Sequence, residues 1–204
     1  MDISRVCSES QISDVAELAR VIWTDHFTPI IGRDQVDYML DKFQSEKAIA
    51  AQIGDGYEYY AVSRDGRIVG YLAVAPDAGA GMLMISKIYV LKSERGHGLG
   101  RAMLEFAEDL CRERRFHALY LTVNKNNRSS IAWYARMGFR NAGSLVQDIG
   151  GGFWMDDYRM EKTIGQPSPA DGPQKPAPGE RRRPQDTVPD SRDETERATD
   201  RPDG

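Results

Sequence analysis

Hydrophobic and polar positions follow two different periods along the first 164 residues, and these periods predict the secondary structure. Apolar residues three and four apart predict helices, whereas short runs rich in β-branched and aromatic residues predict strands. The first helix is expected to run from Ser8 to about Trp23. The other expected helices cover residues 34–43, 45–53, 98–114 and 129–137, and the expected strands cover residues 3–7, 57–64, 67–75, 82–90, 118–123, 140–148 and 153–162.

Short local signals indicate where several of these elements begin and end. Ser8 and Gln11 have the spacing of a capping box, and Pro29 with Gly32 should break the chain after the first helix. The pair Asp65-Gly66 is typical of a tight hairpin turn. Strands before and after a long central helix, with hairpins at both ends, favour a mixed α/β (α+β) layer fold.

Composition divides the chain into two parts. Of its 204 residues 40% are hydrophobic, but residues 165–204 hold eight of the ten prolines and only four apolar side chains. Such a segment cannot bury enough surface to offset its backbone entropy. We therefore expect a folded domain over residues 1–164 and a disordered, proline- and charge-rich tail over residues 165–204.

Charge and cysteine content exclude several classes of protein. The formal net charge of −4 is shared by domain and tail, which argues against a nucleic-acid partner. Cys7 and Cys111 lie far apart, so neither a disulfide scaffold nor a metal site is expected. The chain begins without a signal-peptide pattern and has no apolar run long enough to span a membrane. We expect a soluble, cytoplasmic protein without a membrane partner.

A glycine-dense loop, Arg95-Gly96-His97-Gly98-Leu99-Gly100, follows a strand and opens the long helix. Backbone N–H groups and the helix dipole make such a junction a site for an anion, most often a phosphate. The loop lacks the Lys-Ser or Lys-Thr end of a P-loop. It also lacks the third glycine of a dinucleotide-binding loop, because the sixth position is Arg101 or Met103.

Two motifs together indicate a family. The loop has the form Arg-x-x-Gly-x-Gly, and downstream Asn127 is followed by Tyr134 and then by Gly138-Phe139. In this order and spacing the two motifs resemble those of the GCN5-related N-acetyltransferase (GNAT) superfamily. The resemblance covers residues 1–164 and is weakest over the first 55. It implies a mostly antiparallel sheet of six or seven strands, splayed between the fourth and fifth and flanked by helices.

The resemblance also implies a co-substrate, acetyl-CoA, and the residues that bind it. The loop would wrap the pyrophosphate, the strand 88–90 would lend its backbone to the pantetheine arm, and Asn127 would bind that arm or cap the next helix. The cofactor-binding residues expected on this basis are Ile88, Tyr89, Val90, Arg95, Gly96, His97, Gly98, Leu99, Gly100 and Asn127.

The reaction implied is transfer of acetyl from a thioester to a primary amine. Tyr134, at the position of the family's tyrosine, would donate a proton to the departing thiolate. Many relatives use a glutamate of the fourth strand as general base, but here residues 82–90 contain no carboxylate. Glu58, His26, Asp156, Asp157 or a relayed water remain open as the base.

Aromatic and acidic residues near the first helix and the last hairpin predict the acceptor. Such side chains suit a cationic amine, so we expect a small, polyamine-like or amino-sugar-like acceptor rather than an acidic one. The residues concerned are Trp23, Asp25, His26, Phe27, Tyr38, Asp148, Phe153, Trp154, Asp156 and Asp157. A non-catalytic acetyl-CoA or CoA sensor, and an enzyme acting on protein or peptide N-termini, are the alternatives. A homodimer is possible through the closing hairpin.

Overall fold

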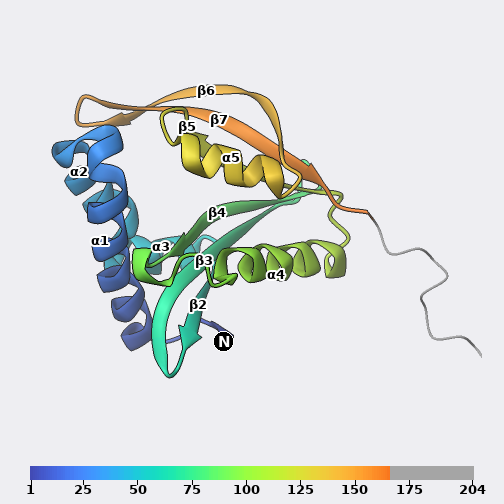
Figure 1. Ribbon diagram of the computed structural model, residues 1–204, viewed down its shortest axis with the longest axis horizontal. Coiled ribbons are helices and arrows are strands. Elements are labelled where there is room, and N and C mark those ends of the chain that lie inside the picture. Colours follow the sequence, from blue (N-terminus) through green and yellow to red (C-terminus); the bar gives the residue numbers. More distant parts are fainter. Residues whose placement is uncertain (166–204) are drawn as a thin grey trace, which may run out of the picture. The chain divides into compact units, whose positions relative to one another are not determined.

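The structure is a computed structural model that describes residues 1–165; the predicted tail lies outside this part of the chain. The described part holds five α-helices, one short 3-10 helix and seven strands, and Figure 1 shows their arrangement. In chain order the elements are β1 (Asp2–Arg5), α1 (Glu9–Ile31), α2 (Arg33–Gln44), α3 (Glu46–Gly54), β2 (Glu58–Arg64), β3 (Arg67–Asp77), β4 (Met82–Val90), η1 (Lys92–Glu94), α4 (Leu99–Glu113), β5 (Ala118–Asn124), α5 (Arg128–Arg136), β6 (Arg140–Gly150) and β7 (Phe153–Thr163).

The seven strands form one mixed sheet in the order β1-β2-β3-β4-β5-β7-β6. All neighbouring strands are antiparallel except β4 and β5. These two pair in parallel only over residues 82–84 and 118–120, so the remainder of β4 separates from β5. The predicted splay between the fourth and fifth strands is confirmed, and it opens the sheet on one side.

Two hydrophobic cores lie on opposite faces of the sheet. One core packs α4 and α5 against the strands through residues such as Met103, Leu104 and Tyr134. The other packs α1 to α3 through residues such as Val15 and Val36. The sheet is therefore covered on both faces, and the splay leaves a passage between the two layers.

The first helix is longer than predicted. The capping box at its start is present, with the Ser8 hydroxyl accepting from the Gln11 backbone N–H. The prediction that the helix ends near Trp23 is wrong, because α1 continues through Pro29 to Ile31. Pro29 lacks the N–H that would donate to the carbonyl of Asp25, and its ring crowds that carbonyl, but only two helical residues follow it before α1 ends. Gly32, at φ of 83°, then separates α1 from α2.

The closing hairpin of β6 and β7 is anchored on α2. Its turn contains three glycines with positive φ, and the Tyr38 hydroxyl donates to the Ile149 carbonyl at 2.6 Å. A Cβ added at Gly150 would come within 2.7 Å of the Tyr38 oxygen, so the turn packs directly on this ring. Among the described residues no helix is both long and apolar enough to span a membrane.

Candidate active site

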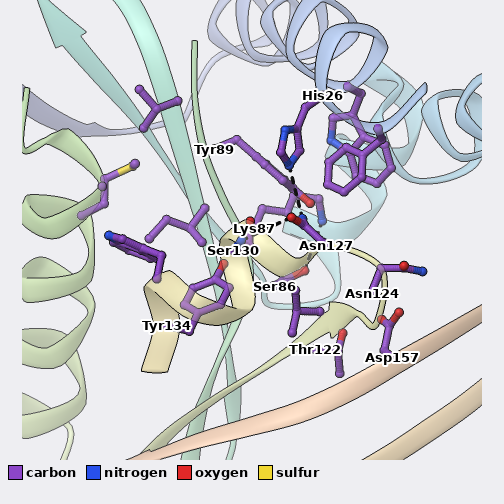
Figure 2. Close-up of a pocket in the computed structure, with 18 of the residues that line it drawn as sticks. His26, Ser86, Lys87, Tyr89, Thr122, Asn124, Asn127, Ser130, Tyr134 and Asp157 are labelled. Atoms are coloured by element: carbon purple, nitrogen blue, oxygen red, sulfur yellow. Dashed lines mark hydrogen bonds between the residues drawn. The ribbon is translucent and has the colours of Figure 1, made fainter. Parts of the chain in front are cut away.

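The splay between β4 and β5 opens into a cavity of about 1000 Å³. This volume lies at the upper end of the range of about 300–1,000 Å³ that is usual for small-molecule pockets. The cavity is bounded by the last turns of α1, by α2 and α3, by β4, by the start of α4, and by α5 and β7. Figure 2 shows side chains from these elements converging on the same space.

The glycine loop forms one end of the cavity. Gly98 is the N-cap of α4 in the left-handed conformation, at φ of 80°, and no side chain accepts from the first N–H groups of the helix. Gly96, Gly98, Leu99 and Gly100 line the cavity, although the Leu99 side chain itself is buried in the core below. The loop therefore presents backbone N–H groups and the positive end of a helix dipole.

His97 differs from its neighbours in the loop. Its side chain is exposed, its Nδ1 lies 3.3 Å from the Glu94 carbonyl oxygen, and it is absent from the cavity wall. Among the residues predicted to bind the cofactor, it alone does not line the cavity.

His26 connects the two sequence motifs. Its Nδ1 lies 3.3 Å from Arg95 Nη1, and its Nε2 lies 3.3 Å from Asn127 Nδ2 (Figure 2). Burial, and next the charge of Arg95, lower the pKa of this imidazole, so it is neutral at pH 7. A neutral imidazole accepts only one hydrogen bond, and His26 therefore serves one of these two donors at a time.

Asn127 begins α5 and fixes the direction of that helix. It is 4% exposed, and its Oδ1 accepts from the Ser130 backbone N–H at 3.3 Å. Trp133 on the same helix packs so closely on α4 that a Cβ at Gly100 would lie 3.3 Å from its ring. A glycine at this position therefore lets α5 pack closely on the start of α4.

Tyr134 comes from the inner side of α5 and lines the cavity. Its side chain is 9% exposed and contacts the rings of Trp133 and Phe139. Its hydroxyl makes no hydrogen bond with any of the described residues. Burial raises the pKa of Tyr134, so the hydroxyl stays protonated at neutral pH. It is an available proton donor beside β4.

A β-bulge decides which side chains of β4 face the first helices. Ala73 pairs with Lys87 and Val74 with Ile85, so Ser86 is the extra residue. Beyond the bulge Ile88 and Val90 contact the α4 side, whereas Tyr89 packs against the α1 side with Trp23 and Phe27. All three residues of the predicted 88–90 strand line the cavity, as do Ser86 and Lys87.

The three carboxylates considered as general base differ in whether they reach the cavity. Glu58 is absent from the cavity wall and is held by Arg114, whose guanidinium donates to both of its oxygens at 2.6 and 2.8 Å. Asp156 is 55% exposed and pairs with Lys125. Asp157 alone of the three lines the cavity, at 5% exposure. Burial raises the pKa of Asp157 to about 6.

Four of the ten residues expected at the acceptor site line the main cavity: Trp23, His26, Phe27 and Asp157. Tyr38 instead holds the hairpin turn, and Asp25 lines a smaller hollow of about 230 Å³. Asp148 accepts from the Gly150 N–H inside its own turn. Phe153, Trp154 and Asp156 also lie outside the main cavity. The acidic cluster that would suit a polyamine is therefore not assembled.

Comparison with known protein families shows to which family the chain belongs. The sequence profile of the acetyltransferase (GNAT) family matches residues 16–139, which is more than half of the chain. The chain belongs to the GNAT family. The family is one of acetyltransferases.

Individual GNAT relatives are more distant. Streptothricin acetyltransferase of Streptomyces lavendulae is 36% identical over 98 residues, which are 48% of this chain and 52% of that protein. The chain thus spans about half the length of this relative. An L-methionine sulfoximine/L-methionine sulfone acetyltransferase of Pseudomonas paraeruginosa is 28% identical over 120 residues, 56% of this chain and 69% of that protein.

A solved structure supports the predicted GNAT fold. The PaiA N-acetyltransferase of Thermoplasma acidophilum, in complex with coenzyme A, aligns with a TM-score of 0.64 and 18% identity. The alignment covers 80% of this chain and 99% of that chain. The likeness confirms the fold class predicted from the sequence.

The end of the cavity at the glycine loop has the donors that acetyl-CoA requires. A pyrophosphate needs backbone N–H groups and a cation, which Gly98, Gly100 and Arg95 offer at the start of α4. Val90 accepts from Arg95 Nε at 3.3 Å, so the guanidinium is held beside the loop. The residues present therefore fit the co-substrate of the family.

Proposed function

We propose that this protein transfers the acetyl group of acetyl-CoA to the primary amine of a small molecule. The observation that carries the proposal is that one cavity is lined by the glycine loop, Tyr134 and Asp157 together. The names of the two relatives above support an acceptor of small size. Because Asp157 is the buried carboxylate of the wall, the geometry favours an acceptor with a single ammonium group over a polyamine.

Each residue of the site has a proposed task. The N–H groups of the loop and Arg95 bind the pyrophosphate, and the backbone of residues 88–90 and Asn127 hold the pantetheine arm. Bound acetyl-CoA supplies the acetyl thioester. Asp157 receives the proton of the attacking ammonium, and Tyr134 donates a proton to the departing sulfur. His26 helps to position Arg95 or Asn127, since its ring nitrogens lie 3.3 Å from each and accept from one of them at a time.

Arg95→Ala should weaken coenzyme A binding by about 10- to 100-fold, because a charge-assisted hydrogen bond to phosphate is lost. The dissociation constant is measured by calorimetry. Arg67→Ala, at an exposed arginine outside the cavity, is the matched control. Equal affinities of Arg95→Ala and the wild type would contradict the assignment of the loop.

Asp157→Asn should lower kcat/KM for the amine about 100-fold at neutral pH, the usual scale of general-base catalysis. The carboxylate is active in its ionised form, so the wild-type rate should rise as pH increases through about 6. The rate of the variant should not show this rise near pH 6. Asp156→Asn, at the exposed neighbour, is the control. If the rise of the wild-type rate with pH survives in Asp157→Asn, Asp157 is not the base, and His26 or a relayed water takes this role.

A panel of amines tests the proposed function. Purified protein and acetyl-CoA are mixed with amino acids, amino sugars, polyamines and peptides, and release of free thiol is followed. Cys7 is exposed, so a blank without amine is subtracted. Thiol release that depends on a small primary amine supports the proposal. Release with peptides alone indicates an N-terminal acetyltransferase, and cofactor binding without release indicates a sensor.

We also propose that the protein is cytoplasmic and that it forms a homodimer. Leu145, Val146 and Trp154 are exposed on the closing hairpin, which is compatible with a second copy at this edge of the sheet.

A further inference from the structure

Lys87 is the one buried lysine of the described residues, with 6% of its surface exposed. Its Nζ donates to Gln52 Oε1 at 2.6 Å and to Ser86 Oγ at 3.2 Å, and it lies over the rings of Tyr57 and Tyr59. No ion pair of Lys87 with a carboxylate occurs within residues 1–165. Burying a charge without a counterion is costly, so a lysine in this position requires an explanation.

Lys87 also lines the cavity of the candidate active site. The bulge at Ser86 turns its side chain to the same face of β4 as Tyr89, the face that packs on α1 and α3. Figure 2 places Lys87 among the labelled side chains of the cavity, on a different strand from Asp157. A buried cation and a buried carboxylate therefore line a single space.

The other charges of the cavity wall have different positions or partners. Arg95 belongs to the glycine loop and Arg101 to the first turn of α4, both at the cofactor end, and Arg136 lies at the last turn of α5. Glu94 accepts from Arg64 at 2.9 Å, and Asp55 is exposed after the end of α3. Lys87 and Asp157 are thus the two buried charges of opposite sign that can meet an acceptor.

We propose that the acceptor is a small amino acid, whose carboxylate binds to Lys87 while its amine faces Asp157. The inference rests on the proposed function and specifies its substrate class. A carboxylate would supply the counterion that Lys87 lacks, at a buried ammonium group that lies 5.7 Å from the Tyr57 ring and 5.2 Å from the Tyr59 ring. A polyamine has no group for Lys87 and would be repelled by it.

The test compares acceptors that differ only in the acid group. Amino acids such as methionine and phenylalanine, with β-alanine as a longer spacing, are assayed beside their primary amides and decarboxylated amines. The amine of an amide loses its proton more easily, so a preference for the acid cannot come from intrinsic reactivity. We expect kcat/KM for the best amino acid to exceed that of its amide by at least about 10-fold.

Lys87→Met should bring that ratio close to one, whereas Lys47→Met, at an exposed lysine of α3, should retain it. As a measurement that needs no variant, deaminated carboxylates of the same size should compete with the amine on the wild type, and the matched alcohols should not.

Two results overturn the inference: amides or decarboxylated amines that match the acids, or a preference for acids that survives in Lys87→Met. The outcomes separate the inference from the proposed function. If amines without an acid group are acetylated equally well, the proposed acetyl transfer is supported, but Lys87 does not bind a carboxylate of the acceptor. If no amine of either series releases thiol although coenzyme A binds, acetyl transfer to small amines is itself wrong.

Discussion

Tyr134→Phe should lower kcat by about 100- to 10,000-fold, the range expected when a positioned proton donor is removed. The departing group is a thiolate with a pKa near 8.5 if it resembles a cysteine thiol, so a donor at neutral pH accelerates its release. Tyr134 is suited to this because burial keeps its hydroxyl protonated and it faces the cavity from α5. The substitution removes one oxygen and keeps the ring contacts with Trp133 and Phe139.

The measurement is kcat at saturating amine together with the dissociation constant of coenzyme A. We expect the affinity to stay within about threefold of the wild type, since the hydroxyl acts on the reaction rather than on binding. Tyr120→Phe is the matched control, because that hydroxyl donates to Asp77 outside the cavity. A kcat for Tyr134→Phe equal to that of the control would show that another group protonates the sulfur.

Lys87→Met should stabilise the folded protein against unfolding. Burial lowers the pKa of Lys87 from 10.5 to about 7, which corresponds to a cost of about 4 to 5 kcal/mol at pH 7 relative to an exposed lysine. Methionine has a similar length and no charge, so it avoids this cost. Gln52 Oε1 retains the hydroxyl of Tyr59 as a donor at 2.8 Å and is not left unpaired.

The pH dependence of this effect has a definite sign. Between about pH 7 and pH 10.5 the unfolded chain holds a proton on Lys87 that the folded protein has released, so wild-type stability rises with pH. Because the folded-state amine is half titrated near pH 7, the advantage of Lys87→Met should shrink by about 2 kcal/mol from pH 7 to pH 9. Below about pH 7 the advantage should be constant.

Urea unfolding of wild type, Lys87→Met and Lys47→Met at the two pH values measures the effect. Because the Lys47 side chain is exposed, its variant should follow the wild type at both. A Lys87→Met protein that is less stable at pH 7, or whose advantage does not change with pH, would contradict the description of Lys87 as a desolvated amine.

Local sequence signals located most of the fold and the residues at the glycine-loop end of the cavity. The glycine loop and the Asn127-to-Tyr134 helix are contiguous motifs, and backbone conformation within a few residues determines how they present N–H groups and a hydroxyl. Gly98 at positive φ and Asn127 as a helix cap are local requirements of this kind. Such requirements can be read from residue type and spacing.

The acceptor end depends on long-range geometry that spacing does not encode. Strand alternation in β7 directs Met155 and Asp157 to the cavity and leaves Trp154 and Asp156 outside it, and the phase of this alternation is set by pairing with β5. On β4 the single extra residue Ser86 shifts the alternation of the strand, and this shift places the Lys87 side chain on the same face of the sheet as Tyr89. A lysine in an apolar strand was the one signal that could have indicated its role.

A single-turnover experiment tests the central claim, direct acetyl transfer to a small amine in this cavity. Wild-type protein loaded with one equivalent of acetyl-CoA is mixed with the best amine of the panel, and both products are quantified by mass spectrometry. We predict that acetylated amine and free coenzyme A appear in equal amounts and at the same rate. Coenzyme A released without acetylated amine, or acetyl-CoA that stays bound and intact, would contradict the account.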